Sequence, residues 1–149
     1  MMKILVINGP NLNLLGKREK NHYGSFSYED LQMQVKKCAE DMNISVDFFQ
    51  SNSEGAIVDR LQTATNYDAL IINVAAYTHT SIAIRDVLIA INIPFVEVHI
   101  SNIYTREHFR KFSYLSDIAV GVISGFGIYS YLMAVEYFAA KKGYKEKTL

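Results

Sequence analysis

The chain has 149 residues, half of them apolar, and its 15 basic and 15 acidic side chains leave no formal net charge at pH 7. A chain of this length can bury a substantial core as one domain, which we expect to span residues 1–149. The balanced charge lacks the electrostatic footprint of a protein that binds nucleic acid or an anionic membrane, so neither is expected as a partner.

Cysteine content and the first residues bear on the compartment. Cys38 is the only cysteine, which excludes an intramolecular disulfide or a cysteine-based metal cage and is typical of a reducing cytoplasm. The opening segment, MMKILVING, has too short an apolar stretch for a signal peptide, and no apolar segment is long enough to span a bilayer. We therefore expect a cytoplasmic protein whose partner is a small molecule or another protein.

Apolar runs of strand length alternate with stretches of helical spacing along the chain. The runs lie at residues 4–7, 46–49, 69–74, 95–100 and 119–123, and the helical stretches at residues 28–42, 54–65, 81–91, 106–112 and 128–142. Ser27 and Ser53 precede two of the helical stretches and are expected to cap them. This alternation predicts a flavodoxin-like, doubly wound α/β domain: a five-stranded parallel sheet in the order 2-1-3-4-5 with helices on both faces. Only the tail KKGYKEKTL, residues 141–149, is expected to be loose.

Polar side chains follow the first, third and fourth predicted strands. The first strand leads into a polar loop, residues 9–24, and loops of that length are commonly functional. Ligands of open parallel sheets bind beyond the carboxyl ends of the strands, so these side chains are expected to share one edge of the sheet. In chain order they are Asn11, Arg18, Tyr23, Asn73, His79, Thr80, Ser81, His99, Ser101, Asn102, Arg106 and Arg110.

The fourth strand carries two charged or titratable residues in an otherwise apolar run. In FVEVHIS, alternation puts Glu97, His99 and Ser101 on one side of the strand. One interpretation is an edge strand with a solvated face, but the surrounding valines and isoleucine are too apolar to favour it. On a central strand the glutamate and histidine must be paired or line a cavity. A carboxylate that orients or charges an imidazole suits general acid chemistry.

Other candidates also allow simpler interpretations. Arg18 and Tyr23 taken alone are most often surface residues, although an arginine in the same loop could stabilise a phenolate. His79, before Thr-Ser, can serve only to help start a helix. Asp86, two turns further along, is typical of a surface or interface salt bridge.

The sequence lacks the usual cofactor motifs. GFG at residues 125–127 follows the last strand and has no third glycine, so it is not a dinucleotide fingerprint. There is no Walker A loop, nucleophile elbow or HExxH segment, and the four histidines show no metal-ligand spacing. We expect chemistry carried by side chains alone, without a metal or cofactor.

Several segments together resemble one enzyme family, the type II 3-dehydroquinate dehydratases. They are NGPNLNLLG at 8–16, REKNHYGS at 18–25, AYTHTSIAIRD at 76–86, VEVHISN at 96–102, and RxxFRxxSYLS with GVISGFG through residue 127. The likeness runs from the first strand to the last helix. Its motifs occur in the same order as in the family, which makes it specific.

The resemblance implies a lyase that dehydrates 3-dehydroquinate to 3-dehydroshikimate in the shikimate pathway, by an anti elimination through an enolate. Tyr23 would remove the proton from C2, with a pKa lowered by Arg18. Asn11 would hold a water that stabilises the enolate. His99, assisted by Glu97, would protonate the departing hydroxyl.

The same resemblance implies substrate-binding roles for six further residues: Asn73, His79, Asp86, Ile100, Ser101 and Arg110. The backbone N–H groups at Ile100 and Ser101, with the serine hydroxyl, would take the substrate carboxylate. Asn73, His79 and Arg110 would hold its ring hydroxyls. Family members form dodecamers built from trimers, and Asp86 would reach a neighbouring subunit's site.

The chain departs from the family at two turns. Val74 and Ala75 follow Asn73 where the family commonly has Pro-Gly, so the backbone that holds Asn73 is expected to differ. Lys20 stands where a proline is frequent, which is expected to leave the loop from Arg18 to Tyr23 more mobile.

The alternatives to this enzyme are a flavodoxin-like binding or receiver module and an inactive structural homologue. Pro10 and Leu12 do not suit the Ser/Thr-rich phosphate loop of a flavin carrier. A receiver would need paired acids after the first strand and a lysine after the fifth, which the sequence lacks. The presence of Arg18, Tyr23 and His99 argues against an inactive homologue.

Overall fold

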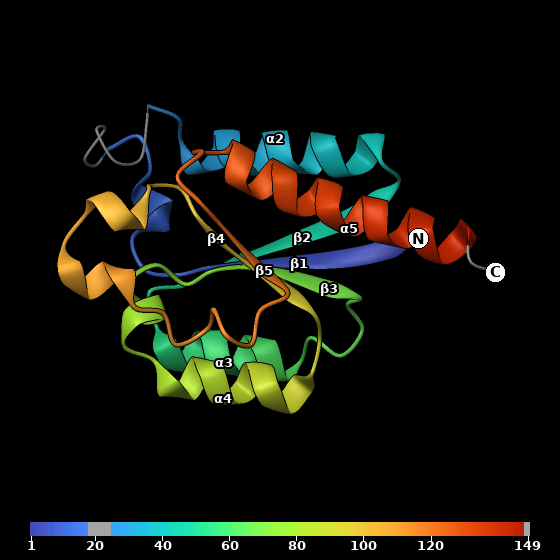
Figure 1. Ribbon diagram of the computed structural model, residues 1–149. Coiled ribbons are helices and arrows are strands. Elements are labelled where there is room, and N and C mark those ends of the chain that lie inside the picture. Colours follow the sequence, from blue (N-terminus) through green and yellow to red (C-terminus); the bar gives the residue numbers. More distant parts are fainter. Residues whose placement is uncertain (18–24, 148–149) are drawn as a thin grey trace.

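A parallel five-stranded sheet forms the centre of the molecule (Figure 1). The computed structural model describes residues 1–17 and 25–147, with side chains through residue 142. The strands are β1 (Met2–Asn8), β2 (Ile44–Gln50), β3 (Ala69–Asn73), β4 (Phe95–His99) and β5 (Gly121–Ser124). They pair in the order β2-β1-β3-β4-β5, which confirms the predicted flavodoxin-like order.

Two layers of helices cover the two faces of this sheet (Figure 1). The helices are α2 (Tyr28–Asp41), α3 (Glu54–Gln62), α4 (Ile82–Ile91) and α5 (Tyr129–Lys147). Helices α2 and α5 lie together on one face, and α3 and α4 lie together on the other. None of these helices combines the length and apolarity needed to cross a membrane.

The alternation of side chains along β1 explains why both faces are covered. Ile4 and Val6 belong to the core beneath α2 and α5, whereas Leu5 and Ile7 belong to the core beneath α3 and α4. All four are fully buried, as expected for a central parallel strand. The carboxyl end of this strand is thereby held rigidly at the edge where its polar loop begins.

The predicted helix starts are confirmed in atomic detail. The hydroxyl of Ser27 accepts from the backbone N–H of Asp30, and the Asp30 carboxylate accepts from the N–H of Ser27, which completes a capping box. Ser53 caps α3 by accepting from the N–H of Ala56. These caps set the entry of both helices.

Two element predictions need correction. Residues 106–112 form no α-helix; only a single 3-10 turn, η4 (His108–Lys111), lies there. Helix α5 was expected to end at residue 142 but continues to Lys147.

Candidate active site

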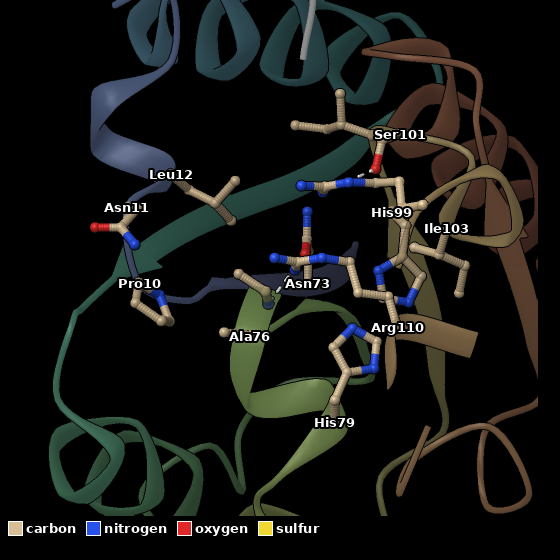
Figure 2. Close-up of a pocket in the computed structure, with 13 residues that line it drawn as sticks. Pro10, Asn11, Leu12, Asn73, Ala76, His79, His99, Ser101, Ile103 and Arg110 are labelled. Atoms are coloured by element: carbon tan, nitrogen blue, oxygen red, sulfur yellow. Dashed lines mark hydrogen bonds between the residues drawn. The ribbon is translucent and has the colours of Figure 1, made fainter. Parts of the chain in front are cut away.

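A cavity lies at the edge of the sheet where β1, β3 and β4 end (Figure 2). In Figure 2, Pro10 and Asn11 lie on one side, His79, His99 and Arg110 on the other, and Asn73 between them. The short turns η1 (Leu12–Leu14), η2 (Ala75–His79) and η3 (Ile103–Thr105) supply much of the wall. The lining residues are Pro10, Asn11, Leu12, Asn73, Ala75, Ala76, His79, His99, Ile100, Ser101, Ile103, Arg106 and Arg110.

The predicted site residues fall into three groups in space. Asn11, Asn73, His79, His99, Ile100, Ser101 and Arg110 all line the cavity. Glu97 lies buried directly behind His99, and Asp86 lies exposed on α4, away from the cavity of this chain. Arg18 and Tyr23 lie outside the described residues.

Asn11 begins the loop after β1 in a left-handed backbone conformation, with φ of 70°. Asparagine tolerates this region better than most residues because its short polar side chain can bond locally. The backbone N–H of Asn11 donates to Oδ1 of Asn52 at 3.0 Å. The Asn11 side chain makes no capping hydrogen bond, which leaves its amide available at the cavity.

Asn73, at the end of β3, is held by a chain of buried hydrogen bonds. Its Nδ2 donates to the Tyr131 hydroxyl at 2.8 Å, and that hydroxyl donates to Oδ1 of Asn8 at 2.7 Å. Nδ2 of Asn8 continues the chain to the hydroxyl of Tyr28 at 3.3 Å. Burial raises the pKa of Tyr131 well above its usual value, so its hydroxyl stays protonated. The amide orientation of Asn73 is therefore fixed from the α2 and α5 side of the sheet.

The turn after Asn73 adopts the backbone of a glycine turn without a glycine. Ala75 has φ of 51°, in the left-handed region that costs an L-residue about 1–2 kcal/mol. Its N–H donates to Oδ1 of Asn73 at 3.2 Å, which fixes the second end of that amide. Gly9 packs against this turn so closely that a Cβ there would lie 2.3 Å from the carbonyl oxygen of Val74. The departure at Val74 and Ala75 therefore leaves Asn73 firmly held.

Glu97 and His99 form a buried pair on β4. Nε2 of His99 lies 2.6 Å from Oε2 of Glu97, and both residues are almost fully buried on a strand that has β3 and β5 on its two sides. The edge-strand interpretation is thus wrong. Because a carboxylate can only accept, Nε2 carries the hydrogen and Nδ1 is the ring nitrogen left for a ligand.

Glu97 is kept ionised by its neighbours. Burial alone raises the pKa of this carboxyl group, but the hydrogen bond and charge of His99 outweigh it, helped by two serine hydroxyls, so the pKa lies below its usual value. Ser113 and Ser116 donate to Oε1 at 2.8 and 2.9 Å. A negative carboxylate therefore faces the imidazole from behind the cavity wall.

His79 is a second imidazole of the cavity, stacked beside the first. Its ring lies 6.4 Å from that of His99, with an angle of 18° between the planes. Nδ1 of His79 donates to the carbonyl oxygen of Phe112 at 2.6 Å, because a carbonyl can only accept. Burial is the strongest influence and lowers the pKa of His79, and the neighbouring His99 and Arg110 lower it further, which outweighs the opposing effects of the Phe112 carbonyl and Glu97. His79 is therefore a neutral ring whose Nε2 can accept a hydrogen bond.

The cavity wall carries two guanidinium groups. Arg106 and Arg110 both line it, and none of the described lining residues is acidic. A guanidinium nitrogen of Arg106 lies 3.5 Å from the hydroxyl of Ser101. The Glu107 carboxylate pairs with both arginines, 2.5 Å from Nε of Arg110 and 3.9 Å from Nε of Arg106. Two guanidinium groups beside a serine hydroxyl suit a carboxylate ligand.

Arg106, one of the polar residues expected after the fourth strand, lies four positions before Arg110 in the RxxFRxxSYLS motif and lines the cavity. Two further residues of this site were missed in the sequence. Ser113 and Ser116 belong to the same motif but act on Glu97, which is 16 and 19 positions away. No local pattern predicts that contact.

The described residues hold no cluster of histidine, cysteine, aspartate or glutamate able to bind a metal ion. Asp86 is exposed and is not among the lining residues of the cavity, and its neighbour Arg85 forms an ion pair with Asp117. The chemistry of the cavity thus depends on an imidazole backed by a carboxylate, a neutral imidazole, amides and two guanidinium groups.

Comparisons with known proteins find relatives that match nearly the whole chain. The family model described as dehydroquinase class II matches residues 2–139. The chain is 54% identical over 138 residues to a 3-dehydroquinate dehydratase of Clostridium botulinum, covering 92% of this chain and 94% of that protein. It is 58% identical over 134 residues to one of Francisella philomiragia, covering 90% and 92%.

Solved structures extend the likeness to the whole fold. The crystal structure of a type II dehydroquinase from Butyrivibrio crossotus has a TM-score of 0.89 and 49% sequence identity. The match covers 91% of this chain and 96% of that chain. With the sheet order, the cavity and the family model in agreement, the chain belongs to the class II dehydroquinase family.

Proposed function

We propose that this chain dehydrates 3-dehydroquinate to 3-dehydroshikimate, as a single catalytic domain without a cofactor, in the shikimate pathway that leads to chorismate and the aromatic amino acids. The observation that carries the proposal is the His99–Glu97 pair, which opens onto a cavity that two arginines make favourable for an anion. The substrate is a carboxylate with a leaving hydroxyl, so it needs both features. The family to which the chain belongs supports the same reaction.

In the first half of the reaction a base removes the proton from C2, next to the ketone. We assign this role to Tyr23, whose phenolate would be stabilised by Arg18. The developing enolate needs a hydrogen-bond donor. Asn11 supplies it through a water, because its amide lies at the cavity and makes no capping bond.

In the second half the C1 hydroxyl leaves as water and the enolate electrons form the new double bond. Hydroxide is a poor leaving group, so it must be protonated as it departs. His99 donates this proton, and Glu97 faces the imidazolium from behind. After product release Tyr23 gives up the proton taken from C2 and His99 regains a proton, both by exchange with solvent, so that no proton is gained or lost over the cycle.

The remaining lining residues hold the substrate. The carboxylate binds at the N–H groups of Ile100 and Ser101 and at the serine hydroxyl, with the guanidinium of Arg106 nearby. The Nε2 acceptor of His79 takes a ring hydroxyl, and Asn73 and Arg110 take the others. These contacts orient C2 and C1 for an anti elimination.

A continuous ultraviolet assay tests the proposal. Purified protein mixed with 3-dehydroquinate should produce the absorbance of the conjugated enone. Treatment with borohydride in the presence of substrate should leave the activity intact, because the described cavity residues include no lysine that could form an imine. Absence of enone formation, or inactivation by borohydride, would count against the proposed reaction.

We also propose a homododecamer built from trimers, in which Asp86 of one subunit reaches the site of its neighbour. Asp86 is exposed on α4 and distant from its own cavity, as such a role requires. Native mass spectrometry should give a mass of twelve chains of 16.9 kDa. A monomer with full activity at assay concentrations would exclude a contribution of Asp86 across an interface.

A further inference from the structure

We propose that Ser113 and Ser116 are positioning residues for the reaction: their hydroxyls hold the Glu97 carboxylate, which in turn holds the imidazole of His99. The inference rests on the proposed function for its kinetic test. Neither serine lines the cavity, so neither is expected to touch the substrate, and their hydroxyls reach the site through the Glu97 carboxylate.

Both hydroxyls donate to the same oxygen of the carboxylate. Ser113 Oγ lies 2.8 Å and Ser116 Oγ 2.9 Å from Oε1 of Glu97, and Nε2 of His99 lies 2.6 Å from Oε2. Glu97 is only 1% exposed, and Ser113 and Ser116 are the hydroxyl partners of its Oε1. The serines therefore leave one carboxylate oxygen for His99 alone and set the plane in which that oxygen lies.

The two serines differ in what else they hold. Ser113 Oγ also accepts from the N–H groups of Leu115 and Ser116, at 3.0 and 3.1 Å, so it closes a local turn. Ser116 Oγ has no other partner among the described residues than Glu97. Ser116→Ala is therefore the cleaner test of positioning.

The segment that carries the serines is anchored from outside the site. A guanidinium nitrogen of Arg85 donates to the carbonyl of Tyr114 at 2.8 Å, and the same arginine pairs with Asp117. The N–H of Tyr114 donates to the carbonyl of Thr78 at 3.0 Å. Arg85, on α4, thus ties the segment of residues 112–117 to the rest of the fold.

The same segment also fixes the second imidazole, since the carbonyl of Phe112 accepts from Nδ1 of His79. One short segment therefore sets the hydrogen-bonding state of both stacked rings. The charged or titratable groups near Glu97 are His99 and His79, with Arg110 beside the latter, and Asp117 is engaged by Arg85. The segment itself contributes only neutral hydroxyls to Glu97.

Removing the hydroxyls should shift the pH profile of turnover. With fewer hydrogen-bond donors the Glu97 carboxylate is less stabilised, so its pKa should rise. The acid limb of the kcat profile should therefore move to higher pH, by about one pH unit in Ser113→Ala/Ser116→Ala and by less in Ser116→Ala. At neutral pH kcat should fall about three- to tenfold in Ser116→Ala and further in the double variant. KM should stay within about twofold, because neither side chain touches the cavity.

Three comparisons complete the kinetic test. Ser116→Thr keeps the hydroxyl at an exposed position and should restore the parent profile. Ser45→Ala, on β2 far from the site, should change nothing. A serine that served only stability would lower the unfolding temperature of Ser116→Ala and leave its pH profile unmoved, and that result would overturn the proposal.

A spectroscopic measurement separates this proposal from the proposed function. In protein with ¹⁵N-labelled histidine, the ring resonances of His99 should move in the folded double variant and stay unchanged in Ser45→Ala. Unchanged His99 resonances in the double variant would overturn the positioning role. If the parent protein fails to dehydrate 3-dehydroquinate, the proposed function fails, yet these resonances still decide whether the serines hold His99.

Discussion

His99→Gln is expected to lower kcat by about 10²- to 10⁴-fold, the usual contribution of a positioned general acid. Glutamine keeps an N–H that can donate to Glu97, so the buried carboxylate retains a partner and the fold should survive. It has no titratable proton to give to the departing hydroxyl. Steady-state kinetics with the enone assay should show the loss in kcat, with KM changed much less.

The matched control is His108→Gln, since His108 is exposed on η4 and does not line the cavity. Its kcat and KM should equal those of the parent. If His99→Gln turned over substrate within about tenfold of the parent rate, the departing hydroxyl would have to be protonated by another group. His79 would then be the candidate to test, because its ring stacks beside that of His99.

Tyr23→Phe is expected to lower kcat by at least about 10²-fold while KM changes little. A phenol has a pKa of about 10 and becomes a base near neutral pH only when a cation stabilises its anion. Phenylalanine keeps the ring but has no oxygen to accept the C2 proton. The residue lies outside the described part of the chain, so this prediction rests on its match to the family's tyrosine.

Tyr137→Phe provides a control for loss of a phenol, because Tyr137 lies on α5 and is 40% exposed. The second measurement is the kinetic isotope effect with substrate deuterated at C2, which should appear or grow in Tyr23→Phe as proton removal becomes limiting. Near-normal turnover in this variant would contradict the role of Tyr23 as the base.

The fold was predictable because each helix and strand has a pattern within its own segment of the sequence. Strand-length runs of Ile and Val, helical spacing and capping serines each predict their own element, and their alternation leaves few topologies for a parallel sheet. The same local rule found the Glu97–His99 pair, since alternation along one strand puts both side chains on one face. Element ends were less predictable, as the continuation of α5 to Lys147 shows.

Contacts between distant segments could not be predicted in the same way. The Tyr131 hydroxyl accepts a hydrogen bond from Asn73, which lies 58 positions earlier in the chain. In the sequence alone, Tyr131 is typical of an ordinary core residue of a helix. The bonds from Ser113 and Ser116 to Glu97 likewise exist only because the segment after η4 folds back beneath β4. Such partners depend on tertiary packing, which the periodicity of a segment does not encode.

Ala75 shows how a binding turn can be kept at low net cost. Its left-handed conformation costs about 1–2 kcal/mol in the native state, against a total stability of about 5–15 kcal/mol for a typical domain. Glycine would avoid this cost, but it would also give the unfolded chain more conformations, worth about 0.4–1 kcal/mol. With alanine at position 75 the unfolded chain has fewer conformations, which offsets part of the free-energy cost of the left-handed backbone in the folded state. The turn beside Asn73 can therefore form without a glycine.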